Sequence, residues 1–276
     1  MITLLSDFGY QDAYVAVMKG VIAAIAPKIP TCDITHLVPP QDILAARFNL
    51  LMAYPHFPAG TVHLAVVDPG VGSSRRAIAL QTPSGFFVGP DNGLFSGIYD
   101  REPIIEAVHL SKSDYWRISE PSKTFHGRDI FAPVAAHLEN GVPIGALGDF
   151  IDPATLVKPD FPSFINYANG ALNQKPVRAT GSLQYIDGFG NLITNIPGDV
   201  VPDHPWMLTV ETPDGPQEIS GAHTYSDVPI RTLVALVGSH GFVEVACNCG
   251  SALVNLSPSA QSLVTVGSIA SLADRI

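Results

Sequence analysis

Residues Val66–Arg76 read VVDPGVGSSRR and join an apolar run to a short charged loop. The run Thr61–Val67 is rich in β-branched residues, which predicts a buried strand. Asp68 follows this strand directly, and a Pro-Gly pair then turns the chain. Arg75 and Arg76 close the loop. We therefore expect a sheet edge that carries a carboxylate and a guanidinium on one stiff loop.

The first half of the chain alternates strand-like and helix-like segments, which is typical of an α/β domain. Helices are expected over Asp12–Ala26, after Asp42, and near Asp129–Glu139. Asp42 is the expected N-cap of the second helix. The pattern predicts an α/β N-terminal domain, residues 1–160, with a mostly parallel central sheet. The expected strands are Ile2–Leu5, Thr31–Thr35, Thr61–Val67, Ala77–Gln81, Phe86–Val88 and Ile104–His109.

From about Pro176 the sequence changes to short strands separated by Gly, Pro, Asn and Asp. This pattern predicts an all-β, barrel-like C-terminal domain over residues 176–276. The segment Asp152–Lys175, which holds three prolines, is the expected linker. The expected strands are Val177–Ile186, Leu192–Ile196, Met207–Glu211, Thr232–Gly238, Phe242–Cys247 and Leu263–Val266.

Composition narrows the class of protein. The chain has 276 residues, of which 46% are hydrophobic, and a formal net charge of −10. Such an acidic chain is a poor partner for nucleic acid. Its three cysteines lack CxxC spacing, so neither a disulfide framework nor a zinc site is expected. The first residues lack a basic signal region, and Lys19 interrupts the longest apolar run, so we expect no membrane span and a soluble cytoplasmic protein.

Two carboxylates follow strands whose carboxyl ends we expect at the same edge of the sheet. Ligands of open parallel sheets bind beyond the carboxyl ends of the strands. Asp7 follows the first strand and Asp68 the third, each next to a turn that contains glycine. Either acid alone could be a turn cap, but both together, with Arg75 close by, predict a binding site at this edge.

Three further groups of polar residues have both a functional and a structural interpretation. Residues 124–131, TFHGRDIF, could contribute His126 to a site or simply begin a helix, with Asp129 complementing its dipole. Residues 187–191, DGFGN, could bind a ligand or form a hairpin turn. Residues 238–251 include Ser239 and two cysteines, which are more often small buried hydrophobes than reactive groups.

In order along the chain, the motifs SDFGYQDAYVAVMKG, VPPQDILAA, VVDPGVGSSRR, GPDNGLFS, TFHGRDIFAPVAAHL, DGFGNLITNI and GSHGFVEVACNCGSA cover almost its whole length. With them the chain resembles the S-adenosyl-L-methionine (SAM) hydroxide adenosyltransferases, relatives of the SAM-dependent chlorinases and fluorinase. The resemblance implies an α/β domain followed by a β-barrel domain. It also implies homotrimers that hold SAM between the N-terminal domain of one subunit and the C-terminal domain of the next.

The resemblance further implies that water, as hydroxide, attacks C5′ of SAM and releases adenosine and L-methionine. SAM is then the substrate, and no cofactor or metal is expected. The matching catalytic residues are Asp68, Arg75 and His126. A guanidinium cannot act as the base at neutral pH, so either Asp68 or His126 takes the proton or orients the group that does.

Substrate contacts also follow from the resemblance by position. Asp7 matches the acid that binds the ribose hydroxyls, and Phe125 matches an aromatic wall near the reacting carbon. The remaining implied contacts lie around the two ends of SAM or line the pocket. They are Asp12, Gln41, Asp187, Asn191, Ser239 and Cys249.

Departures from the family pattern leave alternatives open. His240 stands where the fluorinase has an arginine near the methionine carboxylate. The fluorinase has a tyrosine at the position of Asp68 and a halide-binding serine at that of Gly127. A SAM-dependent halogenase and a non-catalytic SAM- or adenosine-binding protein are competing hypotheses, and the charge of Asp68 and the lack of a side-chain donor at Gly127 argue against the halogenase. Without the resemblance, Asp7 and Asp68 could also be ligands of a metal-dependent phosphohydrolase, although they lack a recognised spacing.

Overall fold

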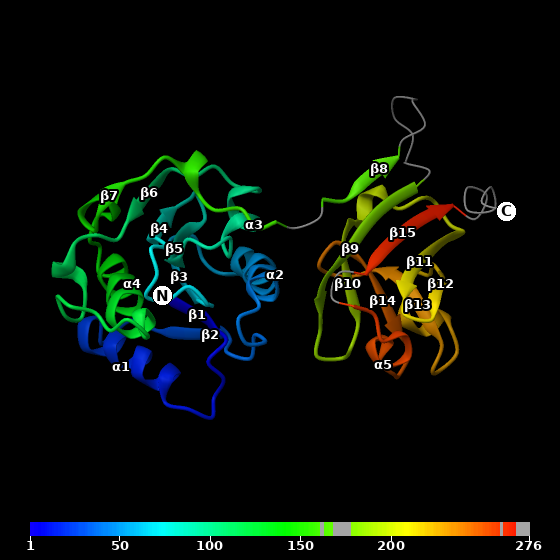
Figure 1. Ribbon diagram of the computed structural model, residues 1–276, viewed down its shortest axis with the longest axis horizontal. Helices are drawn as coiled ribbons and strands as arrows, with labels where there is room; N and C mark the ends of the chain where they lie inside the picture. The colour runs from blue at the N-terminus through cyan, green and yellow to red at the C-terminus, as the bar shows by residue number, and fades with distance from the viewer. Residues whose placement is uncertain (161–162, 168–177, 260–261, 269–276) are drawn as a thin grey trace. The chain divides into compact units, whose positions relative to one another are not determined.

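The computed structural model divides the chain into two compact units, Met1–Pro159 and Asp160–Ile276. It describes residues 1–160, 163–167, 178–259 and 262–268. The first unit is an α/β domain and the second consists almost entirely of strands (Figure 1). In the described residues, no helix is both long and apolar enough to cross a bilayer.

The N-terminal unit is built on a seven-stranded sheet in the order β2-β1-β3-β5-β4-β6-β7. Strands β2, β1, β3 and β5 run parallel, whereas β4, β6 and β7 continue the sheet with antiparallel pairs. The strands are β1 (Ile2–Ser6), β2 (Thr31–Thr35), β3 (Thr61–Val66), β4 (Ala77–Gln81), β5 (Gly85–Pro90), β6 (Glu106–His109) and β7 (Asp149–Phe150). The expected α/β class is confirmed, and its parallel half carries both strands that end in aspartates.

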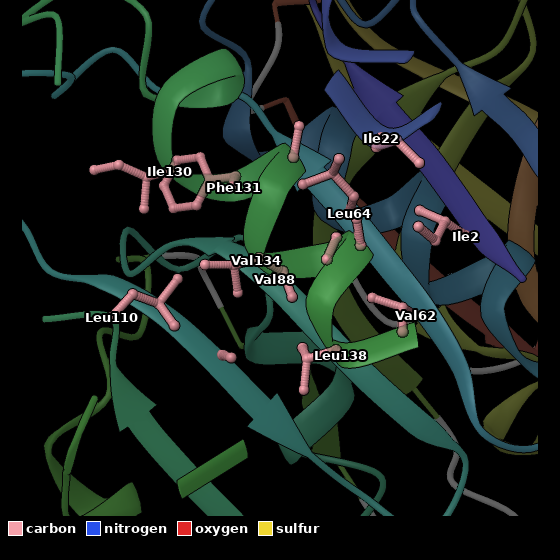
Figure 2. Packing of buried hydrophobic residues seen from close by; sticks show 14 of the residues in the cluster. Ile2, Ile22, Val62, Leu64, Val88, Leu110, Ile130, Phe131, Val134 and Leu138 are labelled. Atoms are coloured by element: carbon pink, nitrogen blue, oxygen red, sulfur yellow. The ribbon is translucent and has the colours of Figure 1, made fainter. Parts of the chain in front are cut away.

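Helices α1 (Tyr14–Ile25) and α4 (Ala132–Glu139) pack on one face of this sheet. Figure 2 shows Phe131, Val134 and Leu138 facing Val62 and Leu64 of β3. On the other face of the sheet, helix α2 (Ile43–Ala53) leads to Tyr54, whose ring contacts the rings of His63 and Phe87. His63 lies between Val62 and Leu64 in β3, so its side chain points to the face opposite theirs. A fourth helix, α3, spans Ser96–Tyr99. Both faces of β1 and β3 are therefore buried, as their apolar sequences predict.

The C-terminal unit is an eight-stranded antiparallel sheet in the order β12-β11-β15-β9-β10-β14-β13, with β8 paired to β9. A bridge between Gly221 and Ala235 joins the two ends, so the sheet is nearly closed. This architecture confirms the expected barrel. The strands are β8 (Ile165–Tyr167), β9 (Arg178–Ile186), β10 (Leu192–Pro197), β11 (Trp206–Thr212), β12 (Gly215–Ser220), β13 (Leu233–Val237), β14 (Phe242–Cys247) and β15 (Leu263–Ser268).

Some local elements differ from the sequence-based expectations. Strand β12 and the short helix α5 (Ala252–Leu256) were not expected; β12 is mostly exposed and carries few apolar residues. Within the expected linker Asp152–Lys175, residues 153–155 form a short helix and β8 pairs with β9. Residues 161–162 and 168–177 of that region lie outside the described part of the chain. The remaining short helices are η1 (Tyr54–His56), η2 (Ser113–Tyr115), η3 (Gly127–Phe131), η4 (Ile144–Ala146), η6 (Gly198–Val200) and η7 (Tyr225–Asp227).

The segment before α4 is held by the buried carboxylate of Asp129. It accepts hydrogen bonds from Arg117 Nε and Arg128 Nε, both at 2.7 Å, and from the Ser122 amide at 2.9 Å. Residues Gly127–Phe131 form one turn of π-helix, and such turns often occur at functional sites. Asp129 therefore does more than complement the dipole at the start of a helix. Its side chain also fixes the loop that precedes His126.

We expect Asp42→Ala to lower the free energy of unfolding of the N-terminal unit by about 1 kcal/mol, the usual effect of losing an N-cap. Asp42 accepts a 2.9 Å hydrogen bond from the Ala45 amide at the start of α2. Urea denaturation measures the effect, and Asp42→Asn, which keeps an acceptor, is the control. Equal stability of the alanine and asparagine variants would contradict the assignment.

Burial alone would raise the pKa of Asp129, but hydrogen bonds from two arginines and a main-chain amide lower it well below its usual value. A lowered folded-state pKa stabilises the fold above the unfolded pKa of about 4 and loses that effect as the pH falls further. Asp129→Asn should therefore cost about 1.5–3 kcal/mol at pH 7 and flatten the acid limb of a stability-against-pH curve. Asp114→Asn, at an exposed position in η2, is the control and should leave the acid limb unchanged.

Candidate active site

Asp68, Arg75 and His126 form one hydrogen-bonded row. Arg75 Nε donates to Asp68 Oδ1 at 2.9 Å, and Arg75 Nη2 donates to Asp68 Oδ2. The same Nη2 lies 2.7 Å from His126 Nδ1. Arg76 instead pairs with Asp91, at 2.8 Å from its Nε. Of the two adjacent arginines, only Arg75 joins this row of three side chains.

A glycine allows the two loops of the row to meet. Gly72 has φ +76°, and a Cβ there would lie 2.3 Å from the carbonyl oxygen of Lys123. The loop after β3 is therefore packed directly against the segment that leads to His126. The Arg75 guanidinium also lies 5.3 Å from the centre of the Phe131 ring. These contacts hold Arg75 nearly buried, with 10% of its side chain exposed.

The hydrogen bonds define the protonation state of His126. A guanidinium has only donors, so Nδ1 must accept, and the proton of the neutral ring is then on Nε2. Burial, followed by the charge of Arg75, lowers the pKa of His126. The ring is therefore neutral near pH 7 and offers Nε2–H as a donor.

A cavity of about 380 Å³ opens beside this row. That volume is at the small end of the usual range for ligand pockets. Five of the expected site residues line it: Asp7, Gln41, Asp68, Phe125 and His126. The other residues that line the cavity are Phe8, Tyr14, Val66, Pro69, Val71, Thr124 and Gly127. The parallel pairing of β1 with β3 brings the two aspartates to one sheet edge, as the sequence predicted.

Asp7 is oriented by the main chain of Gln41. Its Oδ2 accepts from the Gln41 amide at 2.8 Å. Gln41 has φ +66°, a left-handed conformation that is costly for a non-glycine residue. Such strain at a cavity wall is common at functional sites. The remaining acceptor capacity of the Asp7 carboxylate is available to a ligand in the cavity.

Three aromatic rings form one wall of the cavity. The centre of the Phe125 ring lies 5.8 Å from that of Phe8 and 5.2 Å from that of Tyr14. Sequence reasoning did not select Phe8, Tyr14 or Thr124 as site residues. The available signal was position, because Phe8 directly follows Asp7 and Thr124 begins the segment that contains His126. Asp12, in contrast, is exposed and does not line the cavity.

In the C-terminal unit, Asp187 and Asn191 are neighbours in the β9–β10 loop. Asp187 Oδ2 accepts from Asn191 Nδ2 at 2.9 Å, and its Oδ1 accepts from the amides of Phe189 and Asn191, both at 2.9 Å. The segment DGFGN therefore is a hairpin turn, and its aspartate organises that turn. Phe189 projects from it with 81% of its surface exposed.

Ser239 lies in the turn between β13 and β14, and Cys249 follows β14 at the open end of this hairpin. Both side chains are exposed. The ring next to Ser239 is engaged: His240 Nε2 lies 2.8 Å from Glu244 Oε2, and Nδ1 accepts from the Phe242 amide at 3.1 Å. Glu244 also accepts from the hydroxyl of Tyr225 at 2.6 Å. Both ring nitrogens of His240 are thus occupied by the protein itself.

The described residues contain no group of three or more His, Cys, Asp or Glu side chains arranged to hold a metal ion. Both carboxylate oxygens of Asp68 already accept hydrogen bonds from Arg75. A metal ligated by Asp68 would have to compete with this guanidinium, so the donor set fits a metal poorly.

Relatives of known name extend over nearly the whole chain. A (R)-S-adenosyl-L-methionine hydrolase of Salinispora tropica is 40% identical over 269 residues, covering 96% of this chain and 98% of that protein. A fluorinase of an Actinoplanes species is more distant, at 28% identity over 220 residues and 71% of each chain.

Structure and family comparisons agree with this relationship. The crystal structure of an uncharacterized conserved protein from Thermotoga maritima matches with a TM-score of 0.85 and 33% identity, over 97% of this chain and 100% of that one. Residues 2–148 match the SAM hydroxide adenosyltransferase N-terminal domain, and residues 181–265 match the C-terminal domain of the same family. The chain therefore belongs to the SAM hydroxide adenosyltransferase family.

Proposed function

We propose that this protein hydrolyses SAM to adenosine and L-methionine. The observation that carries the proposal is the Asp68–Arg75–His126 row, which borders the same cavity as Asp7 and Phe125. Such a row can activate water next to a bound nucleoside. The name of the Salinispora tropica relative supports SAM as the substrate.

The charges around the cavity favour a cationic substrate. The charged side chains that line it are Asp7 and Asp68, both carboxylates, and Arg75 lies behind Asp68. These three groups sum to one negative charge, which attracts a sulfonium. The aromatic rings of Phe8, Tyr14 and Phe125 add faces on which a cation is stabilised.

Of the two groups that could accept the proton of water, the geometry favours Asp68. His126 Nδ1 is occupied by Arg75, and Nε2 carries a proton, so the neutral ring has no free acceptor. Each oxygen of Asp68 retains a lone pair beyond its bond to Arg75. The positive charge of Arg75 stabilises the developing hydroxide, and His126 contacts Arg75 from the side opposite Asp68.

The reaction balances without a further reactant. The water oxygen forms a bond to C5′ while one of its protons passes to Asp68. The C5′–S bond breaks, and its electron pair returns to sulfur, which converts the sulfonium to the neutral thioether of methionine. Because the sulfonium is already a good leaving group, no acid is needed to protonate it.

Two features disfavour the halogenase alternative. A carboxylate at the cavity repels a halide ion, whose dehydration is costly already. In addition, a Cβ at Gly127 would lie 3.0 Å from Met18 Sδ and 3.2 Å from Phe125 Cε2. The position that carries the halide-binding serine in the fluorinase is therefore crowded here.

We further propose a homotrimer in the cytoplasm, in which the C-terminal unit of one subunit completes the site of another. Exposed apolar side chains support association. Tyr10 and Leu37, near the Asp7 edge, are 58% and 71% exposed, and Phe189 in the DGFGN turn is 81% exposed. Asp187, Asn191, Ser239 and Cys249 would then bind the methionine and adenine ends of SAM.

The direct test is incubation with SAM in isotope-labelled water, with and without an excess of chloride or fluoride. We expect adenosine as the nucleoside product, with the labelled oxygen at the 5′ position. A 5′-halo-5′-deoxyadenosine as the main product would favour the halogenase, and binding of SAM without any product would favour the binding protein.

Asp68→Asn should lower kcat by roughly a hundredfold or more, the usual scale for an acid–base group, while SAM still binds. Asp91→Asn is the matched control, because it breaks the neighbouring Asp91–Arg76 pair outside the cavity. Rates and calorimetric binding would be measured for both variants. An Asp68→Asn enzyme with normal turnover would disprove the role assigned to this carboxylate.

Co-expression tests the shared site. When equal amounts of Asp68→Asn and Asp187→Asn subunits assemble at random, about a quarter of all sites should combine an intact Asp68 with an intact Asp187. Chains that carry both substitutions, mixed with either single variant, restore none and serve as the control. An active monomer in light scattering would refute the assembly.

A further inference from the structure

A buried imidazole beneath the Asp7 loop has no part in the proposed chemistry. His36 is fully buried, and its Nδ1 lies 2.7 Å from Ser6 Oγ. Its Nε2 lies 3.3 Å from Asp33 Oδ1, and Asp33 Oδ2 accepts from Lys19 Nζ at 2.7 Å. A continuous polar chain thus leads from a partly exposed lysine to a serine at the end of β1.

The direction of each hydrogen bond follows from the carboxylate. Burial alone would raise the pKa of Asp33, but the hydrogen bond from Lys19 and the nearby imidazole of His36 lower it, so Asp33 is ionised and only accepts. The contact between His36 Nε2 and Asp33 Oδ1 lacks hydrogen-bond geometry, but the adjacent negative charge favours the ring proton on Nε2. Burial lowers the pKa of His36, which keeps the ring neutral. Nδ1 must then accept from the hydroxyl of Ser6.

The chain ends on the backbone that presents Asp7 to the cavity. With its proton directed at His36, Ser6 Oγ is free to accept from the Phe8 amide, at 3.3 Å. The carbonyl oxygen of His36 also accepts from the Gly9 amide at 2.8 Å. The residues on both sides of Asp7 are thus tied to His36, while its carboxylate is tied to the Gln41 amide.

We propose that His36 is a positioning residue for substrate binding, which acts through Ser6 to fix the backbone of Asp7 and Phe8. The proposal rests on the proposed function, because Asp7 is assigned there to the ribose hydroxyls. His36 does not touch the reacting atoms, and its loss should weaken ligand binding with little effect on the chemical step.

The strand that carries Ser6 supplies a matched control. Thr3, also in β1, makes a 2.8 Å hydrogen bond to Nδ1 of another buried imidazole, His63. Ser6→Ala and Thr3→Val each remove one buried hydroxyl from a histidine, but only Ser6 contacts the Asp7 loop. A general loss of stability should affect both variants, whereas a positioning effect should appear only in Ser6→Ala.

We expect Ser6→Ala to raise KM for SAM and the Kd for adenosine by about 3- to 10-fold, the scale of one lost hydrogen bond, with kcat changed less than about twofold. Thr3→Val should leave both constants near the wild-type values. His36→Asn, which keeps an acceptor near the position of Nδ1, should retain tighter binding than His36→Leu. Equal effects of Ser6→Ala and Thr3→Val on KM and Kd would overturn the proposal.

Two measurements need neither turnover nor ligand. Nitrogen NMR of His36 should show the proton on Nε2, and amide hydrogen exchange at Phe8 and Gly9 should accelerate in Ser6→Ala but not in Thr3→Val. A proton on Nδ1, or unchanged exchange, would refute the positioning role. If the wild-type protein forms no adenosine but these results hold, the proposed function fails while the positioning network stands.

Discussion

The parallel pairing of β1 with β3 is the constraint on which the site depends. The register pairs Ile2 with Val62 and Ser6 with Val66, so both strands end at the same edge. Asp7 and Asp68 leave the sheet there and face one cavity. Both faces of the two strands are buried, and a shift by one residue would exchange the side chains that pack on α1 and α4 with those, such as Thr3 and His63, that face the other way.

The edge of this sheet holds acidic groups that would repel each other without compensation. The positive charge of Arg75 compensates the negative charge of Asp68, and Arg75 is itself held by His126 and by the ring of Phe131. In the part of the chain that the structure describes, the Asp7 carboxylate accepts a hydrogen bond from a main-chain amide and pairs with no cation. The site therefore keeps a net negative charge close to the cavity, which suits a cationic sulfonium and disfavours the binding of a halide ion.

Carboxylates away from the cavity, one of them buried and one partly exposed, fix the loops on either side of it. Asp129 binds two arginines and the Ser122 amide behind His126. Asp33, with Lys19 and His36, lies behind Asp7. In each case a compensated charge outside the cavity orders the segment that reaches into it. This arrangement leaves the cavity groups themselves available to a ligand, because the supporting hydrogen bonds are made elsewhere.

The sequence by itself determined the order of the elements, the two fold classes and the edge on which Asp7 and Asp68 lie. These features follow from hydrophobic period, turn residues and the rule for parallel strand ends, all of which are local in the chain. The antiparallel pairs of the first sheet did not follow from these local signals. Strand β12 pairs with the adjacent β11 but was missed because it is mostly exposed and carries few apolar residues, and β8 lies in the segment expected to be a linker. Asp12, which the resemblance implies as a substrate contact, is exposed and is not among the residues that line the cavity of the N-terminal unit. Only the tertiary structure shows that Arg75 pairs with Asp68 while Arg76 pairs with Asp91. It also shows that both ring nitrogens of His240 already have hydrogen-bond partners within the protein. The contact with Arg75 likewise assigns the proton of His126 to Nε2. These pairings could not be predicted, because a side chain's hydrogen-bond partner is set by packing between segments that lie far apart in the sequence.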